Sequence, residues 1–240
     1  MSPLDPPTSP PDVIEVVEPG VRIDWTTLEL EVTASADAAG PEALDAAEQM
    51  ARRRVDDAYQ KAVGSVWVTN DARVADLVAD GELGTQIRSR VSKWEVDEAT
   101  YRASGRVELR ATLSLQELLR PWALQIARPG VPPTDAPSAT GVVIDARDLG
   151  VRPSYALRLV SSDDRVLYAG ELWEEQAVRV PPYRFVTHPG HPAAAEAGPN
   201  PVLLIADEVR GTNLVLSDAE IVRLGETVLG QTTVIVVVGE

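Results

Sequence analysis

The sequence predicts an α+β protein made of two domains. Apolar and polar residues alternate strictly from Arg106 to Leu115, which is typical of a strand with one buried face. A helical stripe of apolar residues precedes this strand, and several short strand patterns follow a proline-rich linker at 127–140. We therefore expect a β-α-β-β first domain with helices on one sheet face, and a second, smaller, β-rich α/β domain.

The composition of the 240-residue chain excludes several classes of function. Its net charge of −15 argues against nucleic-acid binding, which needs a basic surface. It contains no cysteine, which excludes disulfides, thiol catalysis and zinc–cysteine sites. No run of about 20 apolar residues is present, so we expect no transmembrane helix. The start lacks the apolar core of a signal peptide, so the protein is either cytoplasmic or begins after a removed signal.

The tether and the first half of the first domain combine a proline-rich segment, strand alternation and one long helix. Residues 1–19 are predicted to form a proline-rich tether, in which 13–17 could still dock as an edge strand. Strands are expected at 21–25 and 28–34, separated by a turn or bulge at Thr26 and Thr27. A helix is predicted over 43–63. Its stripe is mostly alanine, so it can lie close to a sheet: Leu44, Ala47, Ala51, Val55, Ala58 and Ala62.

The rest of the first domain, which we place at 20–126, continues as helix, hairpin and helix. A helical pattern over 74–91 is weakened by Gly81 and Gly84. Strands at 93–102 and 106–115 are joined by a tight turn in which Gly105 supplies the positive φ. A short helix at 115–125 follows, and we expect Pro121 to break or kink it.

The second domain, 141–240, is predicted from short strand patterns. Ser217 and Glu220 have the spacing of a capping box, which predicts a helix start. The last strand consists of β-branched residues, so we expect it to be buried on both faces. A long loop is expected at 181–201, and strands at 141–146, 156–160, 165–168, 202–206, 213–216 and 232–238.

Two pairs of residues are candidates for chemistry. His188 and His191 stand in a His-Pro-Gly-His loop, and Asp145 and Asp148 directly follow an apolar strand. Together they could build a metal-dependent enzyme site. The alternative is structural, because proline and glycine disturb the spacing of the histidines, and the aspartates fit a turn that ends at Gly150. The sequence favours the structural interpretation, so no catalytic, cofactor-binding or metal-binding residue is assigned.

Several longer segments occur in a recognisable order. The segment VRIDWTT at 21–27 precedes an extended strand, the alanine-rich helix 43–63, and a helix end and hairpin at 87–113. The segments TGVVIDARDLGVRP at 140–153, 161–168 and 213–224 follow, before the final valine-rich strand. Over about residues 20–240 this order resembles flagellar accessory-ring and related outer-membrane lipoproteins, a family that includes the FlgP basal-disk and FlgT H-ring proteins.

The resemblance implies a non-enzymatic structural subunit of the bacterial cell envelope, in the periplasm or at the outer membrane, with a dodecin-like first domain. Such proteins assemble into rings or discs, so the expected partners are further copies of the chain and flagellar basal-body or outer-membrane proteins. Members carry a lipidated cysteine, which this chain lacks. The alternative is a periplasmic module that binds a ligand or partner. Candidate subunit contacts come from strand edges and wet faces: Leu28, Leu30, Val32, Arg106, Glu108 and Arg110.

Overall fold

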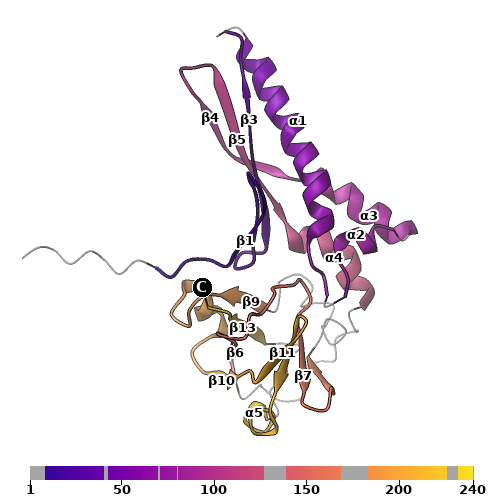
Figure 1. The fold of residues 1–240 in the computed structure, drawn as a ribbon, viewed down its shortest axis with the longest axis vertical. Helices are drawn as coiled ribbons and strands as arrows, with labels where there is room; N and C mark the ends of the chain where they lie inside the picture. Colours follow the sequence, from indigo (N-terminus) through magenta and orange to yellow (C-terminus); the bar gives the residue numbers. More distant parts are fainter. Residues whose placement is uncertain are drawn as a thin grey trace, which may run out of the picture. The chain divides into compact units, whose positions relative to one another are not determined.

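The computed structural model describes residues 9–40, 43–69, 71–79, 81–126, 139–168, 183–225 and 232–239. Within them the chain forms two compact units (Figure 1). The first domain consists of 14–126 and 154–156, and the second consists of 9–13, 139–153 and 157–239. Both contain strands and helices, so the predicted α+β class is confirmed, while the dodecin-like detail stays a prediction.

The first domain contains one antiparallel sheet with the strand order β1-β2-β3-β5-β4. The predicted turn at Thr26 and Thr27 is confirmed, because Asp24 Oδ1 accepts hydrogen bonds from both backbone N–H groups at 2.8 and 3.0 Å. The predicted alternation from Arg106 onward is also confirmed, since every second residue of β5 is buried. The strands are β1 (Ile14–Glu18), β2 (Val21–Asp24), β3 (Glu29–Asp37), β4 (Glu95–Tyr101) and β5 (Arg106–Ser114).

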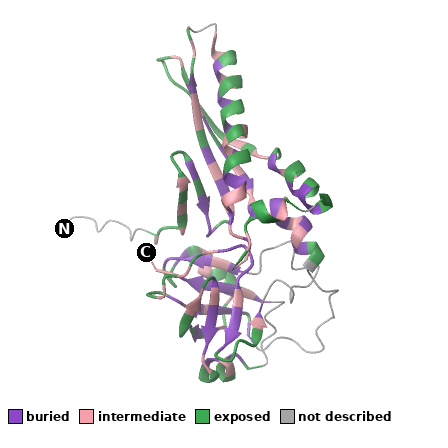
Figure 2. Cartoon of the chain, turned by 45° about the vertical axis from the view of Figure 1, so that its right-hand side comes forward, coloured by how far each residue is buried: buried purple, intermediate pink, exposed green. Residues whose placement is uncertain are grey.

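Helix α1 (Leu44–Ala62) lies along β3 and β5 and buries one side against them (Figure 2). The predicted stripe is shifted near its end, because Tyr59 is fully buried whereas Ala58 is only partly so. The Tyr59 hydroxyl donates a hydrogen bond to the Leu30 carbonyl at 3.2 Å, and its ring stacks on Trp94 at 6.1 Å. A large side chain therefore fills the space that the small residues leave at this end of the helix.

The helical pattern predicted over 74–91 is divided in two. Helix α2 (Val74–Leu77) forms its first part, and α3 (Gly81–Val91) forms its second part. The 3₁₀ turn η2 (Val63–Ser65) precedes both and directly follows α1. Gly84 allows α3 to approach the end of α2, since a Cβ atom there would lie 2.4 Å from the Val78 carbonyl oxygen. The glycine that weakens the pattern in the sequence is thus required by close packing.

Helix α4 (Leu115–Ile126) continues through Pro121, so of the expected break or kink the break is wrong, and the kink stays a prediction. Proline lacks the N–H that would bond to the carbonyl four residues earlier, which belongs to Glu117. Arg90 of α3 supplies the missing donor, because its guanidinium donates to the Glu117 carbonyl at 3.0 Å and to the Glu117 carboxylate at 3.2 Å. A side chain from a neighbouring helix thus satisfies the acceptor that proline leaves open.

Arg90→Met is expected to destabilise the protein by about 1 kcal/mol, because the Glu117 carbonyl loses its donor. In a Pro121→Ala background the backbone N–H returns to the helix, so the same Arg90 substitution should cost less. Urea unfolding of the four variants of this cycle measures the difference. Equal costs of Arg90→Met in both backgrounds would contradict the compensation.

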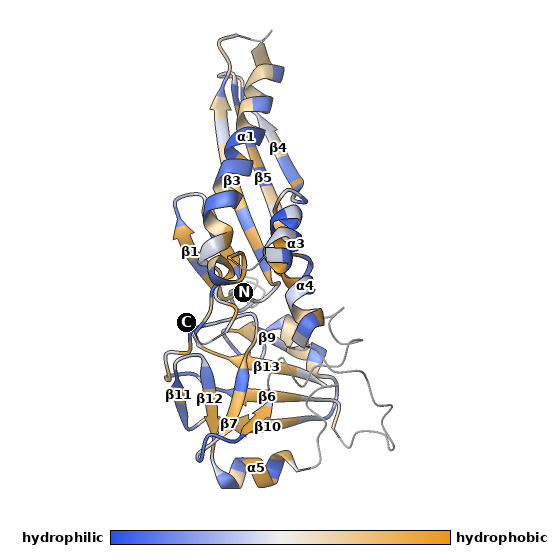
Figure 3. Ribbon diagram, turned by 90° about the vertical axis from the view of Figure 1, so that its right-hand side faces the viewer, coloured by the Kyte–Doolittle hydropathy of each residue, from blue (hydrophilic) through white to orange (hydrophobic). Residues whose placement is uncertain are grey.

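The described part of the second domain contains two four-stranded sheets. In the first, β10-β6-β13-β9, all pairs are parallel, and Figure 3 shows its central strands β6 and β13 as strongly hydrophobic. The expected burial of the last strand is confirmed by residues 234–237. The first sheet comprises β10 (Pro201–Ile205), β6 (Gly141–Asp145), β13 (Thr233–Val237) and β9 (Tyr183–Val186), and the second, β11-β12-β7-β8, comprises β11 (Glu208–Arg210), β12 (Asn213–Leu216), β7 (Arg158–Ser161) and β8 (Val166–Tyr168).

Part of the long loop predicted at 181–201 is regular structure. It contributes strand β9 and the 3₁₀ helix η5 (Pro192–Ala197), which packs on β13 and β6. Gly141 allows this packing, because a Cβ atom there would lie 2.5 Å from the Ala197 carbonyl oxygen. Helix α5 (Asp218–Leu224) begins as predicted, with the Ser217 side chain accepting a hydrogen bond from the Glu220 N–H.

The outer edge of β10 is protected against pairing with another strand. The Ala206 N–H bonds to the Asp145 carbonyl of the β6 segment, whereas the Ile205 N–H bonds to the buried carboxylate of Glu220 at 3.1 Å. In a parallel strand the backbone groups of every second residue point to the same neighbouring side, so the backbone of Pro201 faces outward like that of Ile205. Proline has no N–H to offer to another strand there. The edge of this sheet is therefore largely blocked.

Residues 154–156 belong to the first domain although they follow β6 in the chain. The Tyr155 and Ala156 N–H groups donate to the carbonyls of Trp67 and Val68 at 2.9 and 2.7 Å. The buried Tyr155 ring lies edge-on to Trp122 at 6.2 Å. The strand predicted from residue 156 therefore starts only at Arg158.

Candidate functional site

The first domain leaves one face of its sheet uncovered by α1, and we call this surface the open face. On β2, β3 and β5 its side chains alternate with buried or half-buried ones, and they are exposed or half-buried themselves, apart from the buried Asp24. The strand register aligns them in rows across β2, β3, β5 and β4. The open face comprises Arg22, Glu29, Glu31, Thr33, Ser35, Asp37, Glu98, Thr100, Arg106, Glu108, Arg110 and Thr112.

An open groove of about 380 Å³ lies at one side of the open face, next to β1. Gly20, with φ +82°, contributes to the groove because it carries no side chain. Its carbonyl accepts a hydrogen bond from the Thr33 N–H at 2.7 Å. A Cβ atom at this position would lie 2.7 Å from the Thr33 carbonyl oxygen. The other lining residues are Val16, Glu18, Val21, Arg22, Glu31 and Arg110.

Charges on the open face are mixed and partly paired. Arg22 binds Glu31 at 2.7 Å, whereas Arg110 lies 4.0 Å from Glu98. Partial burial is the main cause that raises the pKa of Glu29, and the neighbouring acidic groups, among them Asp24, add to it. A surface of this kind suits a polar protein contact, because its charges can be paired again across an interface.

Three of the six candidate contacts lie on this surface. Arg106 and Arg110 are exposed and Glu108 is half-buried. The Arg106 guanidinium donates to the Ser35 hydroxyl at 2.6 Å, and Arg102 lies 3.5 Å from Glu108.

The other three candidates are core residues. The side chains of Leu28, Leu30 and Val32 are buried within the first domain. Strand β3, which carries two of them, is paired on both sides, by β2 and β5, so the expected exposed edge at 28–34 is wrong. These side chains are unavailable to a neighbouring copy in this fold. The true edges of the sheet are β1 and β4.

Strand β1 occupies residues 14–18 of the stretch that we placed in the tether, and it realises the edge-strand alternative. Ile14 and Val16 are 39% and 72% exposed, and they pair with Asp24 and Arg22, so β1 adds two exposed apolar side chains to the open face. The buried Trp25 indole donates to the Glu15 carboxylate at 2.8 Å, which ties β1 to the core. The available signal in the sequence was the enrichment of β-branched residues at 13–17.

Residues 9–13, which we call the arm, dock on the second domain. The Thr187 hydroxyl donates to the Pro11 carbonyl at 2.6 Å. The Nδ1 atom of His191 accepts the Ala193 N–H at 3.1 Å and so caps η5. The ring proton therefore lies on Nε2, which donates to Asp12 at 3.0 Å. No sequence signal links Asp12 with a histidine 179 positions away.

The residues proposed for metal chemistry serve structural roles. His188 accepts the Gly190 N–H at 2.9 Å in a turn. Both Asp145 oxygens bind Arg147, at 2.9 and 2.6 Å, and this guanidinium lowers the pKa of the Asp145 carboxyl. Asp148 adopts the left-handed region at φ +64°, as the turn requires. Within the described ranges no three His, Asp or Glu side chains gather as a metal site.

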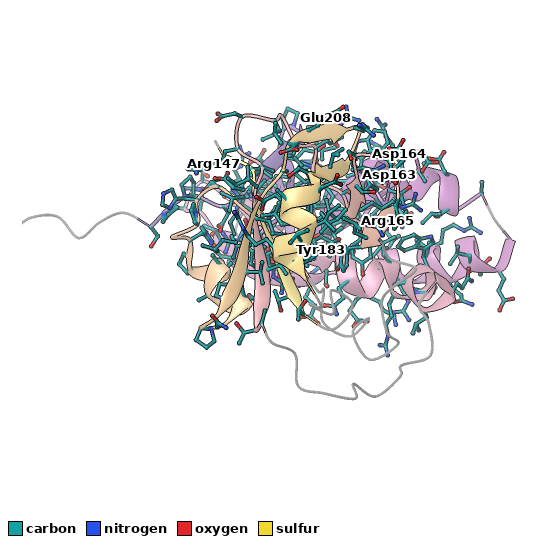
Figure 4. All side chains as sticks on the ribbon, turned by 90° about the horizontal axis from the view of Figure 1, so that it is seen from below. Arg147, Asp163, Asp164, Arg165, Tyr183 and Glu208 are labelled. Atoms are coloured by element: carbon teal, nitrogen blue, oxygen red, sulfur yellow. The ribbon has the colours of Figure 1, made fainter. Side chains whose placement is uncertain are left out.

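A second group of charges surrounds the β7–β8 turn. Arg210 bridges Asp164 at 2.6 Å and Glu208 at 3.1 Å. Asp163 accepts a short hydrogen bond from Ser161, and this bond lowers the pKa of the aspartate. Figure 4 shows Asp163 and Asp164 well apart from Arg147, so these two aspartates and the Asp145–Arg147 pair do not form one site.

Glu29→Gln is expected to stabilise the protein at pH 7, by less than about 1 kcal/mol because the carboxyl is partly hydrated. The raised pKa means that ionised Glu29 opposes folding, so the benefit is present at neutral pH. It should vanish as the pH falls below the ordinary glutamate value of 4.5, where the group is protonated in both states. Thermal unfolding across pH, with Asp57→Asn on α1 as the charge control, measures it. A variant less stable than the parent at pH 7 would contradict this account.

His191→Asn is expected to release the arm and leave η5 in place. The asparagine oxygen can still accept the Ala193 N–H, but it offers nothing at the position of Nε2. Hydrogen exchange should therefore quicken in residues 9–13 and stay unchanged in η5. His191→Ala, which removes both contacts, should cost about 1 kcal/mol more in stability. Unchanged exchange of the arm in His191→Asn would show that Asp12 is not held by this ring.

Comparison with known proteins adds one family match. No curated protein matches the chain. Residues 141–240, which correspond to the second domain, match the family defined by the second domain of the Treponema pallidum protein Tp0624.

Among the residues that the structure describes, no helix has the length and apolar character needed to cross a membrane.

Proposed function

We propose that this chain is a non-enzymatic structural subunit of a bacterial cell-envelope assembly, which self-associates into a ring or disc. The observation that carries the proposal is the first domain, whose sheet presents a polar open face and, beside it, the edge strand β1 with the exposed Val16. An open face beside an open edge suits a contact with a different surface of a neighbouring copy. Repetition of such a heterologous contact generates a ring when the rotation closes.

Two further observations support the proposal. The residues that the sequence offered for catalysis are engaged elsewhere, since Asp145 binds Arg147 and His191 holds the arm. The family match, to a domain of a bacterial protein, supports the bacterial part of the proposal. The resemblance to flagellar accessory-ring proteins supplies the finer part of the proposal, namely a place in the periplasm or at the outer membrane near the flagellar motor.

Light scattering over a concentration series tests the proposal. The purified chain should have a mass of several copies, and Val16→Glu, which places a charge on the β1 edge, should reduce it. Val222→Glu is the matched control, because Val222 on α5 is also strongly exposed, at 80% against 72% for Val16. A single-chain mass at every concentration would overturn the proposal. A mass that falls equally in both variants would remove β1 from the contact.

A further inference from the structure

We propose that Thr187 and His191 form a receptor for the arm of a second copy of this chain, so that exchanged arms link neighbouring copies. The inference rests on the proposed self-association and names its contact. It assigns a binding site to the second domain and an extended Pro-Asp segment as its ligand. In the structure the chain's own arm shows how such a segment is held.

The receptor consists of buried polar groups whose hydrogen bonds are completed by the arm. Thr187 and His191 are each only 8% exposed. One donates its hydroxyl to the Pro11 carbonyl, and the other donates Nε2–H to the Asp12 carboxylate. Removing the arm would leave both donors to be satisfied by water in a confined place, which costs free energy. The site therefore favours an occupant with a carbonyl and a carboxylate at this spacing.

The arm has the chemistry of a linear recognition segment. Pro10 and Pro11 precede Asp12 and lie outside any helix or strand. Proline fixes its own φ angle and restricts the residue before it, so an extended segment loses little conformational freedom on docking. It also has no N–H, so Pro11 presents its carbonyl alone, which is the group that Thr187 binds.

The position of the arm in the chain makes it suitable for exchange. By its contacts it belongs to the second domain, but Ile14, the next residue after it, starts β1 of the first domain. A short segment that packs on one domain and is joined directly to the other can be replaced by the identical segment of another copy without any new contact surface. Arm and receptor are different surfaces, so each copy offers one of each, and the contact is heterologous.

Single-cysteine variants test the exchange directly, because the natural chain has no cysteine. One variant carries Ser9→Cys in the arm and the other His188→Cys beside the receptor, so the two contacts themselves stay intact. The variants are mixed, unfolded and refolded together, and treated with a flexible bismaleimide. Each chain has one thiol, so a link between position 9 and position 188, identified by mass spectrometry, can form only between two copies.

We expect this mixed link in the parent background and its loss when the receptor chain also carries His191→Asn and Thr187→Val. A mixed link at the same yield in the receptor double variant would reflect random collision and overturn the proposal. Absence of the link, in a chain that light scattering shows to be assembled, would overturn arm exchange and leave the proposed function standing. A single-chain mass by light scattering would refute both.

Discussion

The first domain depends on burying only one face of a five-stranded sheet. Helix α1 achieves this with small residues such as Ala47 and Ala51, which let it lie close to β3 and β5. Because only this side is covered by α1, every second residue of β5 must be apolar and its neighbours polar. The alternation in the sequence, the helix layer and the open face are three consequences of the same constraint.

Chain topology adds a second constraint. Two short segments pack on one domain although the neighbouring strands in the chain belong to the other domain. The arm docks on the second domain, and residues 154–156 add backbone hydrogen bonds to the first. Each segment is too short to fold alone, so its conformation is set by the groups that receive it, such as the Thr187 hydroxyl and the Trp67 carbonyl. Such contacts over long sequence separations carry a loop-closure cost, and specific hydrogen bonds offset it.

Local patterns predicted the elements whose stability is local. Strand β5, helix α1 and strand β12 (Asn213–Leu216) follow from alternation and helical spacing. The turn at Thr26 and Thr27 was visible because the alternation breaks there. The continuous helix through Pro121 could not be foreseen, since the compensating donor comes from Arg90, 27 residues from Glu117. Strand β9 was missed for a similar reason, because it is stabilised by pairing with β13.

The candidate site was predictable only in part. The polar side of β5 was recognised as a surface, whereas Leu28, Leu30 and Val32 were placed at an edge because the sequence does not show which strands pair on both sides. The arm receptor had no local signal, as Asp12 and His191 lie 179 positions apart in the chain. Strand order and long-range pairing are properties of the folded chain, and no single stretch of sequence contains them.

The central claim is that copies of this chain assemble through surfaces that differ from one another. Electron microscopy of the purified full chain tests it most directly, because closed assemblies can be seen and measured individually. The account predicts rings or discs of uniform diameter. Particles no larger than one chain, or irregular clusters without a repeating contact, would contradict it.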